Sequence, residues 1–221
     1  MDKIPEEMAA LLETAKQIQQ KALESLSEPL RSKMIVVHEF RSWLTYESDR
    51  GCALMATAYL DEQLEQLIRA KLIDDTKVVN GIFEGQGALT TFSSRIDIAY
   101  LLGLIPKNAQ RDLHLVRKIR NEFAHLSENV TFEKPEIASR CKELYFNGMS
   151  GSVSPRSMFT RAMMGLLGLI QVTAIKTKHE EVVPEFDIEA TRAGAKMFYD
   201  LLKAEGYQEV VKDLMSDISF E

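Results

Sequence analysis

An arginine, an asparagine and a histidine gather near the end of one predicted helix, at Arg120, Asn121 and His125. An arginine stays cationic at any physiological pH, whereas a histidine changes its charge near neutral pH. Metal-independent RNA cleavage needs a base for the 2′-hydroxyl proton and a cation for the crowded phosphate. In that chemistry His125 would be the base or acid, Arg120 the phosphate clamp and Asn121 a positioning group.

Helix geometry limits how these residues meet. Five residues turn an α-helix by about 140°, so Arg120 and His125 do not share a face. Asn121 and His125 are four residues apart and do share one, and Arg117 lies within about 80° of His125 on the same projection. The long Arg120 side chain could still reach the histidine from the flank, and so could an arginine from a second subunit.

A structural interpretation of the same residues competes with the catalytic one. In it, Asn121 and His125 bind buried carbonyl groups at a helix end, and Arg120 pairs with an acid such as Asp97 or Glu62. Residue pairs of this kind are common by chance. Structural ion-pair networks also perturb the pKa values of titratable groups, so such a pair need not mark a functional site. The spacing leaves both interpretations open.

The elements that carry these residues are predicted to be helices almost throughout, because apolar residues recur with the helical period and strand signals are nearly absent. The sequence therefore predicts an all-α bundle. Expected helices cover about 5–26, 30–46, 49–71, 74–83, 89–104, 106–127, 133–145, 155–176 and, after Pro184, on to about 215.

Breaks in the pattern suggest three parts. Residues 1–48 would form an N-terminal helical extension, which ends at the capping segment 48–51. Residues 49–146 would form the helical core, and a glycine- and serine-rich loop follows it. Residues 147–221 would be C-terminal helices that pack on the core.

Composition and charge bound the function. The 221-residue chain is 45% hydrophobic and carries a net charge of −6, which argues against a broad basic face for nucleic-acid backbones. We therefore expect no strong direct DNA binding. Cys52 and Cys141 have no metal-ligand spacing and are expected to be buried thiols. No metal and no cofactor is predicted.

The chain shows no targeting or membrane signal. Its N-terminus is polar and lacks the apolar centre of a signal peptide. The longest apolar stretch, 162–175, is shorter than the roughly 18 residues that a membrane-spanning helix needs, and it contains Gln171 and Thr173. We therefore expect a cytoplasmic protein.

From about Gly51 to Leu144 the chain resembles the mannitol operon repressor family. The matching residues are the glycine turn 85–89, the helix 92–105 and the polar helix 112–125. The resemblance implies an all-helical protein of transcriptional regulation whose members bind DNA poorly and lack a helix-turn-helix. A regulator of this kind would act through protein contacts.

The segment with Arg120, Asn121 and His125 also resembles the wider HEPN superfamily. There an arginine, four to six residues and a histidine mark a dimeric, metal-independent ribonuclease. This chain has Ser127 where one group of HEPN toxins carries a tyrosine two residues after the histidine. The resemblance implies a HEPN-like bundle and three candidate catalytic residues, should the protein be a nuclease.

These observations support one leading hypothesis and two alternatives. The leading hypothesis is a non-enzymatic, HEPN-like transcriptional regulator that acts through a protein partner, as a homodimer. The first alternative is a HEPN-type endoribonuclease or toxin-like component that cleaves RNA with Arg120 and His125 from two protomers. The second is a defence or stress module whose partner gene supplies the activity.

Overall fold

The computed structural model describes residues 6–125, 130–148, 153–207 and 209. These residues form nine α-helices and one short 3-10 turn, η1, and contain no strand, which confirms the predicted all-α bundle. The elements are α1 (Glu6–Glu24), α2 (Leu30–Thr45), α3 (Asp49–Lys71), α4 (Thr76–Phe83), α5 (Phe92–Leu101), α6 (Lys107–Ala124), α7 (Pro135–Glu143), η1 (Tyr145–Asn147), α8 (Pro155–Lys176) and α9 (Ile188–Ala204).

Side-chain caps fix where several helices begin. Ser48 accepts a hydrogen bond from the amide of Gly51 at the start of α3, and Thr91 accepts one from Ser94 at the start of α5. Such caps satisfy amides that have no partner inside the helix. The predicted start of α5 at residue 89 was three residues too early. The amide of Leu89 instead bonds to the carbonyl of Ile82, and the Thr91 cap then sets the first helical residue.

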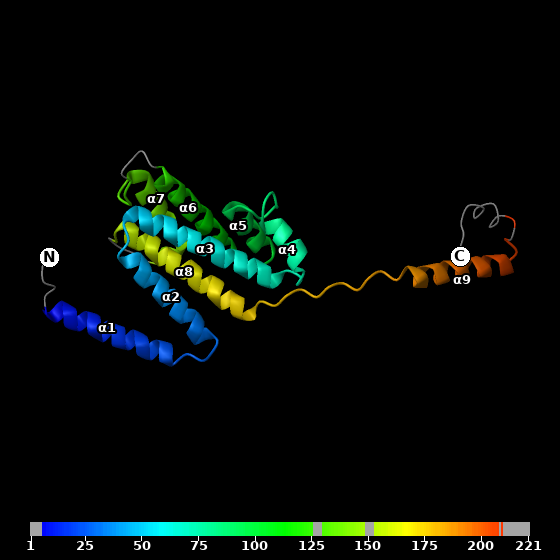
Figure 1. The fold of residues 1–221 in the computed structure, drawn as a ribbon, viewed down its shortest axis with the longest axis horizontal. Coiled ribbons are helices and arrows are strands. Elements are labelled where there is room, and N and C mark those ends of the chain that lie inside the picture. The colour runs from blue at the N-terminus through cyan, green and yellow to red at the C-terminus, as the bar shows by residue number, and fades with distance from the viewer. Residues whose placement is uncertain (1–5, 126–129, 149–152, 208, 210–221) are drawn as a thin grey trace. The chain divides into compact units, whose positions relative to one another are not determined.

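Helix α8 forms the centre of the bundle, beside α2, α3 and α7 (Figure 1). By length and composition it is the one helix in the described ranges that could span a membrane. Its side chains at Phe159, Ala162, Met163 and Leu167 are fully buried against the neighbouring helices. Burial on several sides explains why this helix is apolar nearly all round.

Three aromatic rings connect the end of α6 to α8. Phe123 on α6 lies 4.8 Å from Phe132, and Phe132 lies 5.0 Å from Phe159 on α8, measured between ring centroids. All three side chains are fully buried. Because tilted aromatic pairs are favourable at such separations, this stack holds the C-terminal end of α6 firmly on the bundle.

Polar contacts tie the loops to the helices. Arg156, at the start of α8, pairs with Asp49 at 2.6 Å and also donates to the carbonyl groups of Leu44 and Glu47. The other oxygen of Asp49 accepts the amide of Phe132 at 3.0 Å. One arginine and one aspartate thus join the end of α2, the start of α3, the start of α8 and the segment after α6.

The two cysteines are free and buried, as predicted. Burial raises the pKa of Cys141 to about 12 and raises the pKa of Cys52 as well. A thiol with a raised pKa holds little thiolate, which is the reactive form. Both cysteines therefore act as small apolar core residues.

The chain divides into two compact units, residues 1–180 and 181–221. In the second unit, α9 begins at the cap Asp187 and ends before Gly206, whose φ of +91° suits glycine. One side of α9 exposes Met197, Phe198 and Leu201. The predicted division at residues 48 and 146 stays a prediction.

Candidate functional site

A groove of about 430 Å³ lies between α3, α5 and α6, and it contains two of the three residues singled out by the sequence. Helix α6 buries Ile119 and Phe123 in the core, so Arg120 and Asn121 point outward. The groove is lined by Thr57, Ala58 and Asp61 of α3, by Thr91, Phe92 and Ser93 at the start of α5, and by Arg117, Arg120 and Asn121 of α6.

Arg120 and Asn121 contact each other at this groove. The Arg120 Nη1 donates to Asn121 Oδ1 at 3.2 Å, and both side chains are exposed. His125 is the C-cap of α6 and is not among the residues that line the groove. Its side chain is exposed, and its backbone carbonyl accepts a hydrogen bond from Arg50. The structure therefore brings two of the three residues together, and their catalytic roles stay a prediction.

The acids that the structural interpretation assigned to Arg120 bind other side chains. Asp97 accepts hydrogen bonds from His114 at 3.0 Å and from Gln110 at 2.7 Å. These bonds lower the pKa of Asp97, with the His114 contact as the largest cause. Glu62 accepts a bond from Gln66 on its own helix. Ser127 lies outside the described residues.

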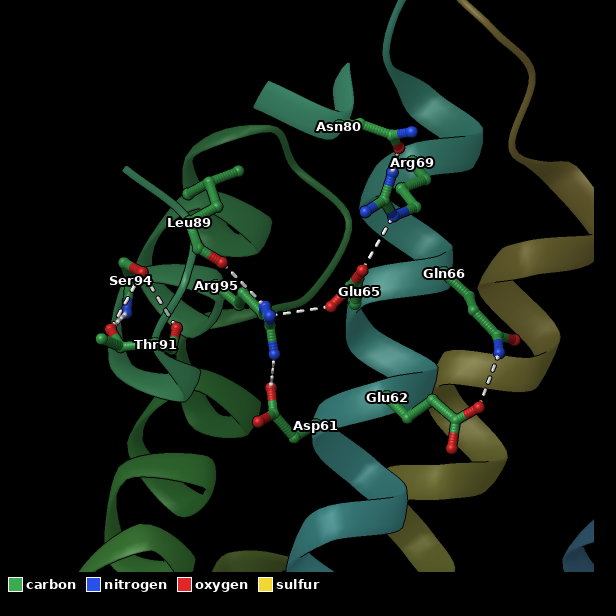
Figure 2. Close-up of polar contacts among 10 residues, drawn as sticks. All are labelled: Asp61, Glu62, Glu65, Gln66, Arg69, Asn80, Leu89, Thr91, Ser94 and Arg95. Carbon is green, nitrogen blue, oxygen red and sulfur yellow. Dashed lines mark hydrogen bonds and ion pairs between the residues drawn. The ribbon is translucent and has the colours of Figure 1, made fainter. Parts of the chain in front are cut away.

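The charged centre of this face is Arg95 rather than Arg120. Figure 2 shows Arg95 reaching from α5 to two carboxylates on one side of α3. It pairs with Asp61 at 2.7 Å and with Glu65 at 2.8 Å, and its Nε donates to the carbonyl of Leu89 at 2.9 Å. Arg95 is only 12% exposed, so these three acceptors replace water around a largely buried cation.

Glu65 continues the network toward α4. It also accepts from Arg69 at 2.8 Å, and Arg69 in turn donates to Asn80 at 2.9 Å (Figure 2). The Arg69 guanidinium lies 4.1 Å above the ring of Phe83. This geometry is a cation–π contact. The network thus locks α3, α4 and α5 together beside the groove.

Asp61 belongs both to this network and to the wall of the groove. Burial raises the pKa of Asp61, against the lowering effect of its hydrogen bond to Arg95 and of the more distant charge on Arg120. A carboxyl group whose pKa is raised although two arginines lie nearby is poorly solvated. Asp61 is therefore a partly desolvated carboxylate at the edge of an otherwise accessible groove.

Arg117 is the least satisfied charged group of the groove. Its Nε is buried and has no hydrogen-bond partner among the described residues. Neither Arg117 nor Arg120 has an ion-pair partner within the part of the chain that the structure describes. The described part of the chain contains no cluster of three or more histidine, cysteine or acidic side chains that could hold a metal ion.

Part of this arrangement could be predicted from the sequence. The helical projection put Arg117, Asn121 and His125 on one side of the helix, and the structure places Arg117 and Asn121 in the groove but not His125. The ion pair between Arg95 and Asp61 was not predicted. Acids four residues apart, at positions 61 and 65, lie on one face of a helix, where a cation from a neighbouring helix can pair with both. That pair of acids was the available signal.

Comparison with known proteins decides the family. Residues 45–162, more than half of the chain, match the family described as mannitol repressor. The chain belongs to the mannitol repressor family. The match covers α3 to α7 and the first part of α8, and it therefore includes the groove and the Arg95 network. The family resemblance inferred from the glycine turn and the two helices that follow it is confirmed.

A solved structure supports the same fold. The X-ray structure of the MtlR-HPr complex from Escherichia coli matches with a TM-score of 0.51 and 19% sequence identity. The match covers 60% of this chain and 99% of the other. At this identity the likeness establishes the shared helical architecture of the mannitol repressor family. A comparison with curated proteins finds no match.

Proposed function

We propose that this member of the mannitol repressor family is a non-enzymatic transcriptional regulator that works through protein contacts in the cytoplasm. The family match over residues 45–162 carries the proposal. The charge supports it, because a net charge of −6 argues against the broad basic surface on which binding to the DNA backbone depends. Regulation would then depend on whether this chain is bound to its partner protein.

HPr is the partner that we propose. The similar Escherichia coli protein was crystallised as an MtlR-HPr complex, and that match spans nearly all of the other chain. A contact shared across the family should use residues inside the family match, which here form the bundle from α3 to α8. We therefore place the HPr contact on this bundle rather than on α1 or α9.

We also propose that the protein forms a homodimer through an apolar patch on α2 and α3. We take this patch to comprise Ile35 and Trp43 of α2, Tyr46 just after it and Met55 of α3, whose exposed fractions are 40%, 53%, 93% and 47%. Ile35, Trp43 and Tyr46 lie within about 80° of one another around the α2 axis. An exposed patch of large apolar residues on a soluble domain is typical of a protein interface. Two of its residues precede the family match, which suits a contact specific to this chain.

The dimer proposal predicts the effect of Trp43→Glu. A charge at the patch centre should raise the dimer dissociation constant by about tenfold or more, since aromatic residues dominate interface energies. Light scattering should give twice 25.0 kDa for the wild type and a mass closer to 25.0 kDa for the variant. Leu101→Glu, at a residue 74% exposed on α5, is the matched control and should remain dimeric. Equal masses for all three proteins would reject this interface.

Two measurements test the regulatory role. Deletion of the gene should change the transcript level of the mannitol operon in the same organism. Purified protein alone should leave the mobility of the operon's promoter DNA unchanged at physiological salt, where a direct reader would bind. Tight, sequence-specific retardation of that DNA would contradict regulation through protein contacts, and an unchanged transcript level would contradict regulation of this operon.

The nuclease alternative has one observation in its favour, the placement of Arg120 and Asn121 in one groove. It is tested by incubating RNA with the protein in EDTA, beside a His125→Ala variant. The regulator proposal expects no cleavage by either protein. Cleavage that leaves cyclic-phosphate ends and disappears in the variant would establish the nuclease instead.

A further inference from the structure

We propose that the groove between α3, α5 and α6 binds a small phosphorylated molecule that also carries hydroxyl groups. The first reason is the charge balance of this face. Arg69 and Arg95 are matched by Asp61 and Glu65, with which they form ion pairs. Arg117 and Arg120 remain without an acidic partner among the described residues, so the groove holds two unmatched positive charges.

The second reason is the buried Nε of Arg117. A buried donor on a cation costs stability when it lacks a partner, so proteins seldom leave one in this state. This donor has no acceptor among the described residues. Arg117 also lines the groove, so an anion there would meet its guanidinium group. Arginine suits this role because its planar fork binds phosphate through two parallel hydrogen bonds.

The third reason is the start of α5 at the same groove. Thr91, Phe92 and Ser93 line the groove, and they are the cap and the first two residues of this ten-residue helix. The Thr91 side chain caps the amide of Ser94, and its carbonyl accepts the amide of Arg95. The backbone amides of residues 92 and 93 precede the two bonded amides in the sequence. They lie at the positive end of the helix dipole, where phosphate groups bind well.

The polar groups around the two arginines favour a ligand with hydroxyl groups. Asn121 can donate and accept, and the buried Thr57 hydroxyl donates to the carbonyl of Ala53, which leaves its oxygen able to accept. An oxygen of Asp61 can accept a hydrogen bond from a ligand hydroxyl group beside the phosphate site. A volume of about 430 Å³ suits a small molecule, and the overall negative charge of the chain disfavours a long polyanion.

The site is tested by calorimetric titration of the full-length protein with glucose 6-phosphate, inorganic phosphate and glucose. Saturable binding is expected for glucose 6-phosphate, weaker binding for phosphate and none for glucose. Arg117→Gln and Arg120→Gln should each weaken binding by about tenfold or more, because each removes a charge-assisted hydrogen bond. Lys118→Gln removes the same charge from an exposed residue of α6 outside the groove and should bind like the wild type.

A second measurement separates binding from folding. Without ligand, Arg117→Met should melt at the same temperature as the wild type or a higher one, because it removes a buried donor that lacks a partner. The wild type should gain thermal stability with glucose 6-phosphate, and Arg117→Met should not.

Three results would overturn the proposal. They are no saturable binding of either phosphate up to about 10 mM, equal binding by the two groove variants and the wild type, or binding of a short single-stranded RNA with neither small anion bound. The test is independent of HPr, so a failure here leaves the proposed partner untouched.

Discussion

Replacing Arg95 with alanine is expected to lower the free energy of unfolding by about 3 kcal/mol at neutral pH, because it leaves charges without a partner. Asp61 and Glu65 are only about a quarter exposed. Asp61 and the carbonyl of Leu89 would lose their Arg95 donor, and Glu65 would keep only Arg69. Urea denaturation followed by circular dichroism measures the change. The same loss would loosen the packing of α5 on α3, which forms one wall of the groove.

The pH dependence of this loss follows from Asp61. Burial already raises the pKa of Asp61, and removing Arg95 removes the largest opposing influence, so the folded-state pKa rises further. A carboxyl group whose pKa is raised on folding stabilises the protein below its unfolded pKa and loses that contribution as the pH rises. The deficit of Arg95→Ala should therefore shrink as the pH falls from about 7 toward about 4.

The matched control is Arg192→Ala on α9. Arg192 pairs with Glu189 at 2.7 Å, but the two side chains are 52% and 75% exposed. Exposed pairs contribute little, so this variant should change stability by less than about 0.5 kcal/mol. An Arg95→Ala variant no less stable than the control would show that the Arg95 network does not hold α5 on α3.

Replacing Phe132 with alanine is expected to lower the free energy of unfolding by about 3–5 kcal/mol, through lost burial and the cavity left behind. Phe132 is fully buried between Phe123 and Phe159, so the change would separate α6 from α8 at one end of the bundle. Chemical denaturation is the measurement. Because α6 carries Arg117, Arg120 and Asn121, the variant should also bind any groove ligand less well.

Phe198→Ala on α9 is the corresponding control. Phe198 is 63% exposed, so its ring buries little apolar surface on folding and its removal costs little. Its effect should stay within about 0.5 kcal/mol. A Phe132→Ala variant with the stability of this control would mean that the aromatic stack does not hold the end of α6.

Helical periodicity predicted most of this fold because apolar spacing along the chain is a local property. The expected segments correspond to α1 through α9, and the ends differ where a cap decides them, as Thr91 does for α5. Caps depend on single side chains, so they shift a boundary without altering the period. The expected burial of both cysteines was also correct.

The candidate site was harder to predict because its contacts join helices that are distant in sequence. Arg95 and Asp61 are 34 residues apart, and only the packing of α5 on α3 brings them together. The helical projection placed Arg117 beside Asn121 but could not show that its Nε would be buried. Likewise, the spacing of Arg120 and His125 did not reveal that the histidine would lie outside the groove lining.

We expect this member of the mannitol repressor family to act through a protein partner, and titration of purified HPr from the same organism into the full-length protein measures that contact. Saturable heat is expected, with one HPr bound per chain at physiological salt, and no such heat when HPr is first heat-denatured. A folded, intact protein that gives no heat with HPr and no change in light-scattering mass on mixing would show that HPr is not its partner.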